Sequence, residues 1–160
     1  MLKFFIFYIL NMIVLFLLFT YQKYIDLQLM YTEVINPIVT FFINSIGINA
    51  IYIGIDIFLP TSTLKVLFGC NGLEAILIFT AGILAFKADL KYKLKYLLQG
   101  ILFISTVNIF RLVILAYVLE VHSNYFSLMH DYVTQHIMIF LAILLFLIFT
   151  SNVKEINKGK

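Results

Sequence analysis

The chain has 160 residues, of which 63% are hydrophobic and 12% charged, and its mean hydropathy is +1.05. A water-soluble domain is nearer half apolar and a quarter charged, so this composition excludes a soluble globular protein and predicts an integral membrane protein. The length predicts one domain over residues 1–160, and the single cysteine excludes an intramolecular disulfide bond.

Four apolar segments predict an all-α membrane protein. A helix needs about 20 residues to cross a bilayer, and we predict spans over residues 4–21, 70–88, 96–119 and 132–150. The second span has to begin near Cys70, because Leu73–Phe86 alone is too short to cross. Lys3 precedes the first span and no small-residue cleavage site follows it, so we expect an uncleaved anchor.

The segment between the first two spans, residues 22–69, is mixed in character. Apolar residues at helical spacing between Val34 and Phe42 predict an amphipathic helix on the membrane surface. Isoleucines at every second position from Ile51 to Ile57 indicate a strand, and TLKVLFG is expected to return as a second one. We therefore predict a short extracytoplasmic β-hairpin before the second span.

The lysines are distributed unevenly over the predicted loops. In a four-span topology one side holds Lys3, Lys87, Lys91, Lys93, Lys95, Lys154, Lys158 and Lys160, and the other side holds Lys23 and Lys65. The positive-inside rule then predicts a multi-pass protein of the cytoplasmic membrane with both termini in the cytoplasm. The hairpin, Cys70 and the loop between the last two spans would face outward.

The only cysteine, Cys70, lies in the sequence GCNG at the start of the second predicted span. The backbone N–H groups and dipole of a helix N-terminus favour a thiolate and lower the pKa of a thiol, which makes it a better nucleophile. Gly69 and Gly72 would let a substrate backbone approach closely. The alternative is that Cys70 fills the core as a small apolar residue and that Asn71-Gly72 is only a turn.

Arg111 lies inside the third predicted span, where a charge costs at least about 2.5 to 3.5 kcal/mol. Such a residue needs a function or a partner. Asn108 is three residues earlier and shares its helix face. One alternative is a structural ion pair with Glu74, one turn beyond Cys70, and another is an arginine that snorkels to the interface.

His130 and Asp131 open the fourth predicted span, His136 lies deeper in it, and His122 lies in the preceding loop. An imidazole near its ordinary pKa of about 6.5 suits proton transfer, so His130 is a candidate general base or acid. The alternative is an ordinary interfacial polar residue. The predicted topology places Cys70, Arg111 and His130 at the same depth, in the outer leaflet of the membrane or at its surface. A thiol, a cation and an imidazole close together indicate an acyl-transfer site.

These motifs resemble those of the exosortase/archaeosortase family of integral membrane cysteine transpeptidase-like enzymes. The family's Cys-[Ser/Asn]-Gly motif corresponds to Cys70, Asn71 and Gly72, and its Asn-x-x-Arg motif to Asn108 and Arg111. Its histidine before the last span corresponds to His130. The resemblance covers roughly residues 46–140.

The chain departs from the family pattern in several ways. It has about four spans where many members have eight, and Glu74 is not expected from the motif. The family's glycine and aromatic residue after the histidine are not evident in HDYVTQHIMIF, so His136 is a rival for the histidine role.

The resemblance implies a thiol peptidase or transpeptidase with Cys70, Arg111 and His130 as catalytic residues. Asn71, Gly72, Asn108, Glu74 and Asp131 would support them. The substrates would be secreted proteins with a C-terminal motif, a transmembrane helix and a basic cluster, cleaved at the outer face of the membrane through a thioester. No cofactor, metal or nucleic acid is expected. The alternatives are a non-catalytic assembly protein with a degenerate site and a small transporter subunit in which Arg111 lines an anion pathway.

Overall fold

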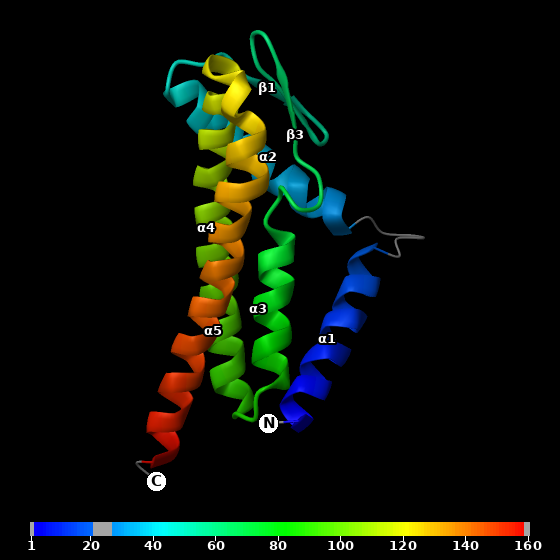
Figure 1. Cartoon of the computed structure of the whole chain (residues 1–160), viewed down its shortest axis with the longest axis vertical. Helices are drawn as coiled ribbons and strands as arrows, with labels where there is room; N and C mark the ends of the chain where they lie inside the picture. The colour runs from blue at the N-terminus through cyan, green and yellow to red at the C-terminus, as the bar shows by residue number, and fades with distance from the viewer. Residues whose placement is uncertain (1, 21–26, 159–160) are drawn as a thin grey trace.

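The computed structural model describes residues 2–20 and 27–158, and the fold is mainly helical (Figure 1). The α-helices are α1 (Leu2–Thr20), α2 (Leu27–Ser45), α3 (Leu73–Ala85), α4 (Leu90–Val121) and α5 (Gln135–Lys158). A 3-10 turn, η1 (Ser123–Tyr125), and a π-helix, η2 (Leu128–Thr134), connect α4 to α5. Residues 21–26 lie outside the described residues. They include Tyr21, the predicted end of the first span, and Lys23 in the predicted start of the mixed segment.

Three helical segments are long and apolar enough to cross a membrane: Leu2–Phe19, Leu90–Val121 and Leu128–Val153. They correspond to three of the four predicted spans and support a multi-pass membrane protein. The predicted second span, residues 70–88, contains the shorter helix α3. Its 13 residues are about 20 Å long at 1.5 Å per residue, less than a bilayer core. A fourth crossing therefore stays a prediction.

Helix α3 lies among α1, α4 and α5 and contacts all three (Figure 1). Two glycines allow this close packing. A β-carbon at Gly100 of α4 would lie 2.2 Å from the Phe79 ring of α3, and one at Gly82 of α3 would lie 2.9 Å from the Phe146 ring of α5. Small residues at helix contacts are typical of membrane proteins, where close van der Waals packing drives association.

Helix α2 forms in the segment predicted to be an amphipathic helix. The apolar face named from the sequence is exposed at Val34, Ile38 and Phe41, whereas Ile35 and Val39 on the opposite face are buried. The buried face packs on α4 and the sheet, in the same core cluster as Cys70. The exposed apolar face is compatible with a membrane-surface helix, and that location stays a prediction.

The region predicted to be a two-stranded hairpin is instead a three-stranded antiparallel sheet in the order β1-β2-β3. Its strands are β1 (Ile51–Ile53), β2 (Asp56–Phe58) and β3 (Thr63–Lys65). The single strand expected over residues 51–57 is wrong, because the chain reverses at Gly54-Ile55, between the paired residues Ile53 and Asp56. Gly54 has a φ of +58°, a value that suits a tight hairpin turn and that glycine adopts without steric cost.

The two ends of the molecule differ in what they hold. The sheet, α2 and η2 lie at one end, and the N-terminus, the C-terminus and the α3–α4 connection lie at the other (Figure 1). Glu120, near the end of α4, accepts hydrogen bonds from the Thr61 N–H at 3.0 Å and the Ser62 hydroxyl at 2.8 Å. These bonds fix the β2–β3 turn against the end of α4, and β3 then leads directly toward Cys70.

Candidate active site

Cys70 lies in the turn between β3 and α3, outside the helix that the sequence predicted to begin there. Glycines with positive φ lie on both sides of it, Gly69 at +88° and Gly72 at +83°. The Cys70 N–H donates to the Leu67 carbonyl at 2.9 Å, which closes the turn, and the residue is only 3% exposed.

The environment of the thiol differs from the one predicted. Burial raises the pKa of Cys70, and the nearby Arg111 charge opposes this rise only in part. A lowered pKa at a helix N-terminus was therefore wrong for this state, because Cys70 precedes the first helical residue and lies in an apolar cluster.

Asn71 and Gly72 shape the turn. The Asn71 side-chain oxygen accepts the Leu73 N–H at 3.1 Å, and its amide donates to the Thr32 hydroxyl at 3.4 Å. Asn71 thus satisfies a backbone donor at the start of α3 and ties it to α2. A β-carbon at Gly72 would lie 2.7 Å from Asn108 Cγ, so only glycine allows α3 to begin this close to α4.

Arg111 projects from α4 into the same place and is 5% exposed. Its Nε donates to the Thr134 hydroxyl at 2.9 Å, and its Nη2 donates to Gln135 Oε1 at 3.1 Å. Longer contacts of 3.4 Å join Nη1 to the carbonyl oxygens of Gly69 and Cys70 and to Asn108 Oδ1. The guanidinium therefore lies directly against the backbone of the cysteine turn.

Glu74 and Arg111 do not form the direct ion pair considered from the sequence. Gln135 lies between them, because its Nε2 donates to Glu74 Oε2 at 2.5 Å while its Oε1 accepts from Arg111. Sequence reasoning missed Gln135 and Thr134. The available signal was two adjacent polar residues inside an apolar span, which usually mark a partner for another buried polar group.

His130 lies in the π-helix η2, at the same end of the molecule as the sheet. Its Nδ1 is 2.6 Å from Asp131 Oδ1, and its ring stacks on Phe126 with centroids 5.5 Å apart. Its backbone carbonyl accepts the Thr134 hydroxyl at 3.3 Å, and Thr134 in turn accepts from Arg111. Because the Asp131 carboxylate is hydrogen-bonded to Nδ1, Nε2 is the ring nitrogen of His130 that could bond to another group.

The other two histidines are placed differently. The His136 Nδ1 lies 2.5 Å from the Tyr132 carbonyl oxygen and its side chain is exposed, while His122 is exposed at the end of α4 beside Tyr117. Among the described residues, no hydrogen bond joins the Cys70 thiol to any histidine. The structure thus brings together Cys70, Asn108 and Arg111, and connects His130 to them only through the backbone and Thr134.

One buried donor in this group has no partner. The Asn108 Nδ2 amide, in a residue with no exposed surface, makes no hydrogen bond in the described part of the chain. Native proteins rarely leave such a group unsatisfied without a reason. The same described residues contain no cluster of three or more metal-ligating side chains.

A search among curated proteins and among solved structures gave no match to the chain. A family model for the transmembrane exosortase (Exosortase_EpsH) matches residues 1–149, which is most of the chain and includes every candidate site residue. This match agrees with the family that the motifs around Cys70, Arg111 and His130 resemble. The chain belongs to the transmembrane exosortase family.

Proposed function

We propose that the protein is a membrane cysteine peptidase or transpeptidase, with Cys70 as nucleophile, His130 as proton carrier and Arg111 as the cation that stabilises developing negative charge. The observation that carries this proposal is the contact of the buried Arg111 guanidinium with the Gly69 and Cys70 carbonyls. Family membership supports an exosortase-like role, and the assignment of each residue is our own.

The proposed reaction begins with transfer of the Cys70 proton to Nε2 of His130 as the substrate binds. The sulfur attacks the scissile carbonyl carbon, and the carbonyl oxygen takes up negative charge. Collapse of this tetrahedral species breaks the C–N bond, and the leaving amine takes the proton from His130. An acceptor amine or water then attacks the thioester while His130 removes its proton. The C–S bond breaks, and the departing Cys70 sulfur takes that proton back from His130.

The lengths of the Arg111 contacts support this role. The bonds to Thr134 and Gln135 are 2.9 and 3.1 Å, whereas those to Gly69 and Cys70 are 3.4 to 3.5 Å. Short bonds fix the guanidinium, and long ones are weak enough to be exchanged for a stronger acceptor. An oxyanion beside Cys70 is such an acceptor, and the unpartnered Asn108 amide is a second donor nearby.

The burial of Cys70 sets a condition on the mechanism. The thiol is 3% exposed and makes no hydrogen bond to His130 in this state. Substrate binding therefore has to open the turn or draw η2 toward it, since a general base must come within about 3.2 Å of the proton it removes. The positive φ values of Gly69 and Gly72 mark the turn as the segment that can rearrange.

The proposed substrates are secreted proteins with a C-terminal motif, a transmembrane helix and a basic cluster, cleaved at the outer face of the cytoplasmic membrane. The lipid bilayer would hold enzyme and substrate together and raise the effective concentration of the scissile bond. The lysine distribution supports cytoplasmic termini and an outward-facing site.

The experiment compares host cells carrying wild type, Cys70→Ala and Ser123→Ala, with membrane abundance measured alongside loss of the C-terminal tail from secreted proteins. We expect Cys70→Ala to accumulate normally and to leave the tails attached. Ser123→Ala, a small change at an exposed position of η1 outside the candidate site, is the control and should retain processing. Normal processing by Cys70→Ala would instead favour a non-catalytic assembly protein.

A further inference from the structure

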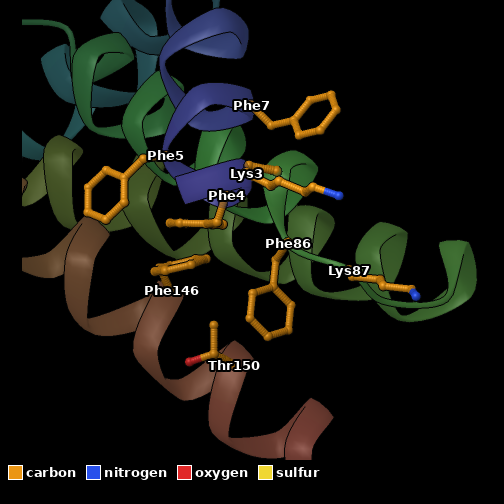
Figure 2. A pocket seen from close by; sticks show the side chains of 9 residues that line it. Lys3, Phe4, Phe5, Phe7, Phe86, Lys87, Phe146 and Thr150 are labelled. Atoms are coloured by element: carbon orange, nitrogen blue, oxygen red, sulfur yellow. The ribbon is translucent and has the colours of Figure 1, made fainter. Parts of the chain in front are cut away.

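At the end of the molecule that holds both termini, an open cleft of about 740 Å³ lies between α1, the end of α3 and α5. Figure 2 shows Phe4, Phe86 and Phe146 grouped in its wall. Phe4 stacks on Phe146 with centroids 5.8 Å apart, and Phe86 meets both rings edge-on. Phe5 and Phe7 line the same cleft and are more than half exposed.

Two lysines complete the lining. Lys3 comes from the first turn of α1 and Lys87 from the α3–α4 connection, and their side chains extend from the same side of the cleft (Figure 2). Both side chains are exposed, and within the described residues neither forms a salt bridge. This apolar aromatic cleft, with two ammonium groups at its edge, lies at the C-terminal end of α3, whereas the cysteine turn precedes the N-terminal end of the same helix (Figure 1).

From this arrangement we propose that the cleft binds one anionic phospholipid, with its phosphate between Lys3 and Lys87 and an acyl chain against the phenylalanines. The acyl chain cannot supply the selectivity, because every membrane lipid offers a similar apolar tail and lipid tails are as apolar as the side chains. The two lysines can select an anionic lipid over a neutral one, because each basic group near an anionic headgroup raises the affinity about five-fold. Basic pockets between helices at a membrane interface suit such headgroups.

The chain contains no tryptophan, so one introduced at the cleft gives an unambiguous fluorescent reporter. We would place Phe7→Trp at the cleft and Phe140→Trp on an exposed face of α5 away from it, in otherwise wild-type full-length protein. Each reporter is reconstituted into vesicles of mixed phosphatidylglycerol and phosphatidylcholine, with the brominated acyl chain on one lipid or the other. Quenching then reports which lipid occupies each position.

At Phe7→Trp we expect brominated phosphatidylglycerol to compete more than ten-fold better than brominated phosphatidylcholine, while Phe140→Trp shows no such preference. Lys3→Gln with Lys87→Gln should remove the preference, and Lys3→Arg with Lys87→Arg should keep it. Lys91→Gln with Lys95→Gln, which removes equal charge from exposed positions of α4 outside the cleft, is the matched control and should leave it unchanged.

Equal quenching by the two lipids at Phe7→Trp would overturn the proposal. So would a loss of preference as large in the Lys91/Lys95 control as in the Lys3/Lys87 variant, because the preference would then come from the general field of the basic loop. The measurement uses no substrate, so its result is independent of whether Cys70 is a nucleophile.

Discussion

Gln135 holds two opposite charges apart while bonding to both. Its amide accepts from Arg111 and donates to Glu74, so the guanidinium and the carboxylate each keep a neutral partner. A direct ion pair would draw Arg111 toward Glu74 and away from the cysteine turn. We therefore infer that Gln135 positions Arg111 and keeps its guanidinium against the Gly69 and Cys70 carbonyls.

A charge exchange tests this arrangement. Gln135→Glu places a second carboxylate against Glu74 and removes the donor between them, and its new contact with Arg111 offsets this only in part. The variant should therefore cost about 1 to 3 kcal/mol of stability and lower the melting temperature in detergent. Adding Glu74→Gln should restore stability, because the amide and carboxylate have only changed places. A double variant as unstable as Gln135→Glu alone would contradict the bridge.

The restored double variant also separates stability from activity. It brings a carboxylate into direct contact with Arg111, so we expect processing to stay below that of wild type although the fold recovers. Equal processing by the double variant and wild type would show that the charge of Arg111 need not be kept free.

His130 and His136 offer a matched pair on one helical stretch. His130 has Asp131 at its Nδ1, whereas His136 is exposed and its Nδ1 lies against the Tyr132 carbonyl oxygen. His130→Ala should lower the rate of tail cleavage by about 10² to 10⁴-fold, as expected for loss of a proton carrier. His136→Ala should stay near the wild-type rate, and the reverse result would move the histidine role more than one turn deeper.

The sequence alone was sufficient to name Cys70, Asn108, Arg111 and His130 as candidates, because each is a rare residue type in its setting. The structure brings the first three together, and the roles of all four stay a prediction. It was not sufficient for Gln135, since a glutamine has no pattern that reveals which two residues it will join. It also left the burial of the thiol open, as the alternative in which Cys70 fills the core. That burial depends on α2 and the sheet covering the turn, which is a tertiary effect beyond the local helix-terminus argument.

At the scale of elements, helices were easier to predict than the sheet. Long apolar runs predict α1, α4 and α5 because a spanning helix requires that length. The isoleucine alternation fits a strand, but a turn at one glycine divided it into β1 and β2. The limits of α3 depend on Gly72 before it and on the extended backbone of Phe86 after it, and neither changes the hydropathy pattern.

The α3–α4 contact makes a prediction at this scale. A β-carbon at Gly100 would lie 2.2 Å from the Phe79 ring, so Gly100→Ala should separate the helices and cost about 1 to 3 kcal/mol. Thermal unfolding in detergent measures this, with Gln99→Ala on the exposed neighbouring position as control. Adding Phe79→Leu should recover part of the loss, and an undiminished melting temperature in Gly100→Ala would contradict the packing.

For the whole molecule, the termini and the α3–α4 connection share one end, opposite the sheet and η2 (Figure 1). We predict that this end faces the cytoplasm. Cys70→Ala removes the only cysteine, so single cysteines can be placed in that background. Lys65→Cys and Ser123→Cys, both exposed, should label in intact cells with an impermeant maleimide, and Lys91→Cys should label only after permeabilisation. External labelling at position 91 would contradict the orientation.

The most direct test of the central claim is detection of an acyl group on Cys70. Membranes from host cells would be quenched in acid, and the peptide containing residue 70 analysed by mass spectrometry before and after neutral hydroxylamine. We predict a hydroxylamine-labile adduct that ends in the cleaved C-terminus of a secreted protein on wild type, and none on Cys70→Ala at equal abundance. Full tail cleavage by Cys70→Ala, with no adduct on the wild-type cysteine, would contradict the account.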